Sequence, residues 1–213
     1  PQVVHEETID RYFDKICGWM SDAQRADMKK KFSRADQLNQ TQQRIYAIAW
    51  DISQHFRENW QGSKFKAQLV APRKRIAILY KQFLDEIGIV SSEVLITSPD
   101  TREGEDEAFG ETSNVEVAFW KRMMDEYGTA KKYEASIINR FKNSDKPEIV
   151  IVVDKLLTGF DEPRNMVLYL DRKLKDHTLL QVIARVNRVC EDKDFGYIID
   201  YYGVLGSLNL ALE

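Results

Sequence analysis

Short runs of valine, isoleucine and leucine, bounded by turn residues, constrain the fold of this chain most strongly. Short apolar runs between turn residues are typical of strands, and continuous ones predict parallel strands that are covered on both faces. The predicted strands are AQLVA (67–71), VLITS (94–98), IVIVVD (149–154), MVLYLD (166–171) and YIIDYY (197–202).

Helical segments lie between some of these strands. Residues 5–60 contain many helix formers and apolar residues at helical spacing, which predicts two or three further helices. The sequence therefore predicts an α/β fold, an open and mainly parallel sheet flanked by helices and preceded by a helical segment. The predicted helices between strands are KRIAILYKQFLDEIG (74–88), KKYEASIINRFK (131–142) and HTLLQVIARVNRV (177–189).

One stretch, PDTREGEDEAFGETSN (99–114), is acidic, contains glycine and lacks periodicity. Such a composition predicts a mobile surface loop. We expect no metal site in it.

The net charge of −3 excludes a globally basic nucleic-acid binder, although a local groove of Lys and Arg can still bind phosphates. Cys17 and Cys190 lie far apart, and His5, His55 and His177 are scattered. This spacing argues against a zinc site and favours buried, reduced thiols in a cytosolic protein.

The chain has no apolar run of about 18 residues and opens with no signal sequence. We therefore expect a cytoplasmic protein without membrane contact. The chain starts at Pro1 and ends on a helix-like segment, so we expect it to be part of a longer polypeptide.

Three predicted strands end in aspartate, at Asp154, Asp171 and Asp200. Ligands of parallel α/β sheets bind at the carboxyl ends of the strands. Carboxylates gathered there could hold Mg²⁺ in a phosphotransferase. However, none of the three is followed directly by a second acidic residue, and lone aspartates commonly cap the next helix. A magnesium-dependent phosphotransferase is therefore the weaker hypothesis.

The loop LLTGFDEPR (156–164) follows a predicted buried strand. Thr158 and Gly159 would let backbone N–H groups approach a phosphate, and Asp161 offers an acceptor to a hydroxyl group or an arginine. The alternative is a turn that simply needs its Gly and Pro.

Three polar residues, Gln181, Arg185 and Arg188, follow at i, i+4 and i+7 of the last predicted helix. A solvated helix face is the simplest explanation of such a row. A neighbouring stripe of the same helix is apolar and would face the core; it consists of Leu179, Val182, Ile183 and Val186.

The order of these elements is a strand, a TGxD loop, a strand, a QxxARxxR helix and a further strand. It resembles motifs V and VI of superfamily 2 helicases and translocases, whose last motif is usually QxxGRxxR; here Ala184 replaces the glycine. The chain thus resembles the second RecA-like domain of that superfamily. Residues 156–189 with FGYIIDYYGV (195–204) further resemble the motor (R) subunit of type I restriction endonucleases. The resemblance is close for 149–204 and looser for 40–148.

The resemblance implies three regions. Residues 1–62 would form a helical lead-in, 63–204 the second RecA-like motor domain, and 205–213 the start of a following helical region. ATP with Mg²⁺ would be held mainly by the first motor domain, which lies outside this sequence.

The resemblance also implies roles for individual residues. Arg188 would act as arginine finger and Arg185 as a γ-phosphate contact, and Gly159 would bind the nucleotide. Gln181 would orient the arginines or the nucleotide, and Asp161 would contact the ribose or tie its loop to the row of Gln181, Arg185 and Arg188. The proposal requires the arginines to project from their own domain, toward a cleft at the carboxyl edge of the sheet.

Contacts to the DNA backbone would come from loops after strands, through Arg73, Thr97, Ser98 and Thr158. For each, a helix-cap or turn role is an equal alternative.

The catalytic half of a motor is absent from this sequence. We find no GxxxxGK[ST] motif and no strand that ends in paired Asp-Glu, so we expect the fragment neither to hydrolyse ATP nor to bind it tightly. The implied partners are double-stranded DNA, the first RecA-like domain and the nuclease domain of the same chain, and the methyltransferase and specificity subunits. A RecA-like nucleic-acid-binding module without turnover remains the other alternative.

Overall fold

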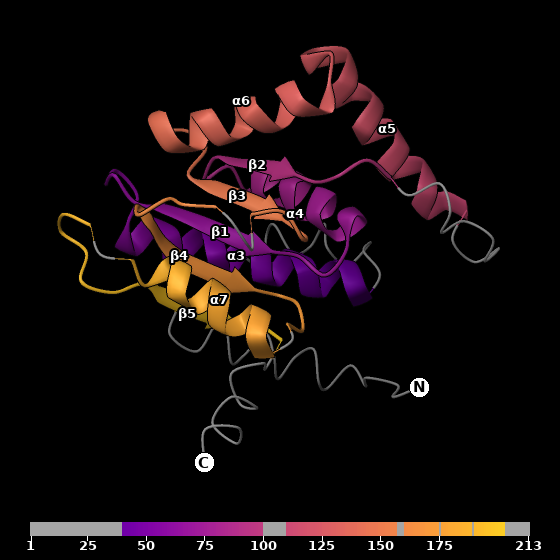
Figure 1. The fold of residues 1–213 in the computed structure, drawn as a ribbon. Coiled ribbons are helices and arrows are strands. Elements are labelled where there is room, and N and C mark those ends of the chain that lie inside the picture. Colours follow the sequence, from indigo (N-terminus) through magenta and orange to yellow (C-terminus); the bar gives the residue numbers. More distant parts are fainter. Residues whose placement is uncertain (1–39, 100–109, 157–159, 175, 189, 203–213) are drawn as a thin grey trace.

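The computed structural model describes residues 40–99, 110–156, 160–174, 176–188 and 190–202 (Figure 1). Five strands form one sheet in the order β2-β3-β1-β4-β5, and all neighbouring strands are parallel. Each of the five predicted strands is confirmed. They are β1 (Lys66–Val70), β2 (Ser92–Leu95), β3 (Ile149–Val152), β4 (Asn165–Leu170) and β5 (Tyr197–Asp200).

The strands end in register, so their carboxyl ends line up along one side of the sheet, the carboxyl edge, and their amino ends along the other, the amino edge. Val70 of β1 pairs with Val152 of β3 and with Leu170 of β4. All residues of β1, β3 and β4 are buried, as continuous apolar runs predict for strands covered on both faces. Loops that follow strands therefore meet at the carboxyl edge, and loops that precede them meet at the amino edge.

The predicted helices are confirmed with shifted ends. They are α4 (Lys74–Ile87), α6 (Ala130–Asn143) and α7 (Asp176–Val186). Helix α4 ends because Gly88 adopts a left-handed conformation (φ 70°) and its N–H bonds to the carbonyl of Leu84. Helix α7 ends three residues before the predicted boundary, so Arg188 lies just beyond the helix and not on its last turn.

The prediction of a loop over 99–114 is wrong for its last part, because helix α5 (Gly110–Tyr127) begins there. The rest of that stretch, 100–109, lies outside the described residues. Phe119 and Met123 are buried one helical turn apart, and this spacing was the overlooked signal. Helices α5 and α6 form a hairpin beside β2 (Figure 1), where the rings of Trp120 and Tyr133 meet edge to face at 5.9 Å.

Helix α3 (Gln40–Asn59) confirms the last helix predicted in 5–60, whereas residues 1–39 lie outside the described part of the chain. Its apolar face belongs to the same hydrophobic core as the sheet, through Ile45, Ile48, Ile52 and Phe56. Of the two cysteines, Cys190 is a free, half-buried thiol and so less buried than predicted; Cys17 is not described. Among the described helices, none is long and apolar enough to cross a bilayer.

A polar network joins α3 to the carboxyl ends of β4 and β5. Asp171 is 1% exposed and accepts hydrogen bonds from Arg44 at 2.5 and 3.2 Å and from the Tyr80 hydroxyl at 2.7 Å. The Tyr201 hydroxyl donates to Asp51. Because buried charges need such partners, these bonds hold α3 in one position on the sheet.

We expect Asp171→Asn to lower the free energy of unfolding by about 2 kcal/mol, because the charge-assisted bonds from Arg44 are lost inside the protein. Urea unfolding followed by tryptophan fluorescence measures this. Asp85→Asn is the matched control: it removes an exposed carboxylate paired with Lys81 on α4 and should cost less than about 0.5 kcal/mol. Equal losses in the two variants would contradict the role of the network.

His55 should make stability depend on pH. Burial lowers the pKa of His55 below its ordinary 6.5, while Asp51 and Glu58 partly oppose that shift. The unfolded chain therefore binds this proton at a higher pH than the folded one, and the free energy of unfolding should decrease as the pH falls from about 7.5 to about 5.5. Burial raises the pKa of Asp51, and this carboxyl group contributes in the opposite direction as the pH falls through its folded pKa.

The His55→Gln variant removes the histidine proton and keeps Asp51, whose pKa then loses the lowering effect of His55. Its unfolding free energy should depend less on pH in this range. An unchanged pH dependence would show that His55 titrates alike in the folded and unfolded chains.

Candidate nucleotide-contact site

Arg188 forms an ion pair with Asp161. The two residues come from different connections: Asp161 lies between β3 and β4, and Arg188 between α7 and β5. Both side chains remain accessible, with 45% of Arg188 and 56% of Asp161 exposed. The structure thus brings together one residue from each of the two predicted motifs.

Asp161 is exposed, but its neighbours on both sides are buried. Phe160 packs against Phe141 near the end of α6, with ring centroids 6.2 Å apart. Glu162 binds Nε of Arg164 at 3.0 Å, and Arg164 in turn donates to the carbonyl groups of Phe141 and Lys142. The backbone that carries Asp161 is therefore anchored to the end of α6.

The ion pair lies at the amino edge of the sheet. Helix α7 connects the carboxyl end of β4 to the amino end of β5, so it must run antiparallel to both strands. Its last residue, Val186, touches Gly196, directly before β5. The expectation that Arg188 faces the carboxyl edge is therefore wrong, because a helix that returns between parallel strands ends at their amino edge.

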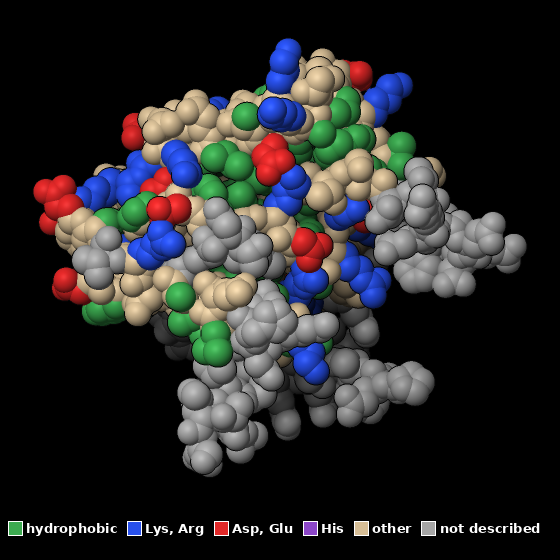
Figure 2. Space-filling view, in the orientation of Figure 1, with side chains coloured by type: hydrophobic (Ala, Val, Ile, Leu, Met, Phe, Trp, Pro, Cys, Tyr) green, Lys and Arg blue, Asp and Glu red, His purple; other side chains and the backbone are tan. Residues whose placement is uncertain are grey.

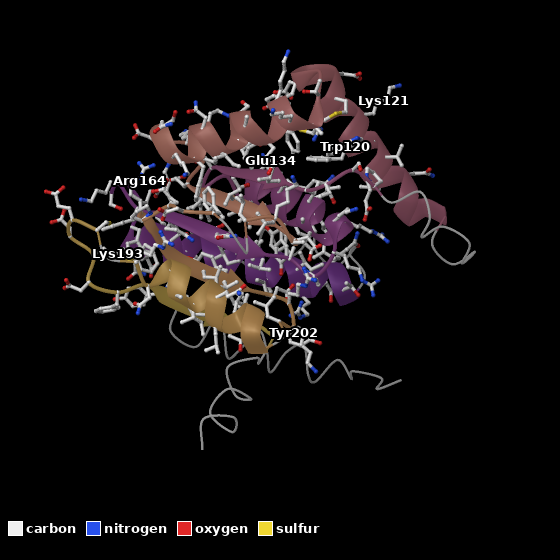
Figure 3. The ribbon with its side chains drawn as sticks, viewed as in Figure 1. Trp120, Lys121, Glu134, Arg164, Lys193 and Tyr202 are labelled. Atoms are coloured by element: carbon white, nitrogen blue, oxygen red, sulfur yellow. The ribbon has the colours of Figure 1, made fainter. Side chains whose placement is uncertain are left out.

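Buried lysines bind backbone carbonyl groups at this same edge, and sequence analysis missed them. Lys193 is 2% exposed, and its Nζ lies 2.8 Å from the carbonyl oxygens of both Pro163 and Asn165. Burial lowers the pKa of Lys193. Figure 3 shows Lys193 and Arg164 at the same end of the sheet. Nothing in the charged segment CEDKDFG distinguishes Lys193 from a surface lysine, since its role arises only from the fold.

Three of the predicted DNA-contact residues, Arg73, Thr97 and Ser98, lie at the opposite, carboxyl edge. Arg73 precedes α4 and is exposed, and its side chain makes no capping bond to the helix. Thr97 and Ser98 are exposed after β2, where Nζ of Lys74 binds the carbonyl of Ser98 at 2.7 Å.

Sequence analysis also missed Glu116 at this edge. Its carboxylate accepts the backbone N–H of Arg75 at 2.8 Å. A carboxylate from α5 therefore caps the first turn of α4, a role that the guanidinium of Arg73 cannot take because it has no acceptor.

The strand-end aspartates do not converge on one point. Asp154 pairs with Arg172 at 2.5 Å, and Asp171 is buried against Arg44. Asp200 accepts the backbone N–H of Tyr202 at 2.9 Å. Within the described residues, no three acidic, histidine or cysteine side chains gather as metal ligands would.

The remaining predicted residues are placed only in part. Gln181 is exposed on α7. Arg185 belongs to the same helix, but its side chain is not among those described. Thr158 and Gly159 lie outside the described residues.

An exposed guanidinium beside an exposed carboxylate can exchange partners. Surface ion pairs contribute only about 0–1 kcal/mol, so a phosphate can compete with Asp161 for Arg188. Arginine suits such an exchange because its planar N–H groups match the oxygens of a carboxylate or a phosphate. The described residues therefore fit a contact to a phosphate that another domain presents.

The parallel five-stranded sheet with its flanking helices is an α/β domain of the RecA-like fold. A fragment described as an HsdR subunit of a type I restriction enzyme from Vibrio vulnificus YJ016 has the same fold, with a TM-score of 0.52 and 17% identity. The match covers 79% of this chain and 28% of that fragment.

Residues 55–203 match the family model "Type I restriction enzyme subunit R domain 3". The chain belongs to this family of R-subunit domains. The HindI endonuclease subunit of a type I restriction enzyme from Haemophilus influenzae is 31% identical over 84% of this chain and 16% of its own length. The MjaVIIP endonuclease subunit from Methanocaldococcus jannaschii, assigned to a type I restriction enzyme, is 32% identical over 93% of this chain. The chain spans 19% of that relative.

We expect Asp161→Asn to change the free energy of unfolding by less than about 1 kcal/mol, because both partners of its ion pair are exposed. Glu162→Gln is the matched control on the next residue. Glu162 is buried against Arg164, so this variant should lose about 2 kcal/mol. Urea unfolding of the two variants measures the difference, and a larger loss for Asp161→Asn would show that the pair is structural.

Proposed function

We propose that this domain is the second motor domain of an ATP-dependent double-stranded DNA translocase in a type I restriction endonuclease. Membership of the R-subunit family supports the proposal. The observation that carries it is the accessible Arg188, held by Asp161 at the junction of the two motif-bearing connections. Arg188 is accessible as expected, but it lies at the amino edge of the sheet, so the proposed nucleotide cleft is at the amino edge and not at the carboxyl edge expected from the sequence.

In the proposed mechanism, Arg188 and Arg185 would contact the phosphates of ATP, which would be held with Mg²⁺ mainly by the first motor domain. When bound, the nucleotide supplies the phosphoryl group that is transferred to water. Arg188 leaves Asp161 and donates hydrogen bonds where negative charge develops, which in comparable enzymes accelerates transfer by roughly 10³ to 10⁵. Gln181, Gly159 and Asp161 orient the nucleotide.

DNA would contact the opposite edge of the sheet. Arg73, Thr97 and Ser98 are exposed there, and Thr158 belongs to the connection that begins at that edge. This β3–β4 connection starts at the carboxyl edge and ends at the amino edge, beside Arg188. It therefore offers a covalent path between a DNA contact and a nucleotide contact.

The domain would act within a larger assembly. The first RecA-like domain and the nuclease domain of the R subunit would complete the motor and cleave DNA. The methyltransferase and specificity subunits would complete the restriction complex in the cytoplasm.

Two alternatives are less well supported. A RecA-like module that binds nucleic acid without turnover would not need an accessible Arg188. A magnesium-dependent phosphotransferase would need free carboxylates at the carboxyl edge, whereas Asp154 and Asp171 are each bound by an arginine.

Replacing Arg188 by Ala in the full-length R subunit should lower the kcat of DNA-stimulated ATP hydrolysis by roughly 10³-fold or more. ATP binding should weaken only modestly, because the arginine acts mainly in the transition state. Steady-state ATPase assays and equilibrium nucleotide binding measure the two effects.

Arg122→Ala is the matched control. It removes another exposed arginine, on α5, which lies beside β2 on the opposite side of the sheet from β5. This variant should leave turnover unchanged. Near-normal turnover in Arg188→Ala would refute the proposed function.

A further inference from the structure

The segment that carries Arg188 is irregular but closely held. Arg188 lies beyond the end of α7, and the chain then makes a tight turn in which Cys190 and Lys193 exchange backbone hydrogen bonds of 3.3 and 2.9 Å. Near its end, the N–H of Gly196 bonds to the side chain of Asn187 at 3.3 Å. A Cβ on Gly196 would come within 2.1 Å of the carbonyl of Val186, so only glycine fits there.

Lys193 ties this turn to the segment that carries Asp161. Its Nζ binds the carbonyl oxygens of Pro163 and Asn165, two and four residues after Asp161. The two members of the Arg188–Asp161 pair are thus carried by separate segments, and one buried ammonium group joins them.

The other charged residues of the turn are peripheral. Glu191 and Asp192 are 90% and 76% exposed and pair with Lys64 at 3.5 and 2.9 Å. Exposed pairs of this kind restrain a loop weakly. Lys193, by contrast, is fixed by two backbone acceptors inside the protein.

We propose that Lys193 is a positioning residue for ATP hydrolysis: by joining the turn after α7 to the β3–β4 connection, it holds Arg188 where the phosphates arrive. This inference rests on the proposed function of Arg188. Lys193 itself touches no nucleotide and acts only through the arginine.

The test compares ATP hydrolysis by variants of the full-length R subunit. Lys193→Met keeps much of the side-chain volume but cannot bind the two carbonyl groups. We expect its kcat to fall on the order of 100-fold, as expected for a misplaced catalytic group, while KM for ATP changes less than about threefold. Lys193→Gln can still donate to one carbonyl and should retain an intermediate kcat, and it serves as the second variant if Lys193→Met folds poorly.

A double-mutant cycle shows whether Lys193 acts through Arg188. In an Arg188→Ala background, Lys193→Met should cause no further loss of kcat, because there is no arginine left to position. If Lys193→Met lowered kcat by the same factor in the wild-type and in the Arg188→Ala protein, the inference would be overturned.

Lys66→Met is the matched structural control. Lys66 is also 2% exposed at the amino edge, and its Nζ binds the carbonyl oxygens of Ser144, Asp145 and Pro147 at 2.7, 2.6 and 2.9 Å. These carbonyl groups belong to the segment after α6, and the Lys66 side chain does not join the turn after α7 to the β3–β4 connection. Lys66→Met should lower the melting temperature as Lys193→Met does but leave kcat unchanged while the protein is folded.

The outcomes separate the two proposals. Normal turnover in Lys193→Met, together with turnover lost in Arg188→Ala, refutes the role of Lys193 alone. If Lys193→Met folds poorly, normal turnover in Lys193→Gln refutes it instead. An equal loss of kcat in Lys66→Met also refutes it. Normal turnover in Arg188→Ala refutes the proposed function, and the role of Lys193 with it.

Discussion

The parallel pairing of five buried strands is the constraint on which the rest of this structure depends. Because every strand runs the same way, every connection must return from the carboxyl edge to the amino edge. Helix α7 does so between β4 and β5, and this return brings Arg188 to the amino edge. Arg73, Thr97 and Ser98 stay at the carboxyl edge. The sheet thereby separates the proposed nucleotide contact from the proposed DNA contacts.

Two buried lysines and the half-buried Arg164 hold the segments at the amino edge in place. Lys66, Arg164 and Lys193 bind backbone carbonyl groups in the last turn of α6, in the segment after it and around the start of β4. A buried carbonyl without a hydrogen bond costs free energy of folding, and so does a buried ammonium without a partner. A hydrogen bond between the two removes both costs. Lys193 and Arg164 thereby hold the segments next to the exposed ion pair, whereas Lys66 holds the segment after α6. In the proposed mechanism Arg188 exchanges partners, while these hydrogen bonds hold the backbone segments on either side of the pair.

Prediction from the sequence succeeded where a local pattern is sufficient. Continuous apolar runs identified all five strands, and helical spacing identified the buried face of α3. It failed for α5, whose start overlaps an acidic stretch and whose short apolar spacing from Phe119 to Met123 was overlooked. It also extended α7 past Val186, because a helical pattern does not reveal that Gly196 packs against that residue.

By itself the sequence determined that this chain forms a parallel α/β sheet, and its motif order indicated the family to which it belongs. Both follow from short-range signals, namely side-chain hydrophobicity and the spacing of a few residues. Only the tertiary structure decided which edge of the sheet Arg188 occupies, that Asp161 is its partner, and that Lys193 joins their two segments. These contacts link residues about 30 positions apart, and their geometry depends on how the intervening β4 and α7 pack, which local patterns do not encode.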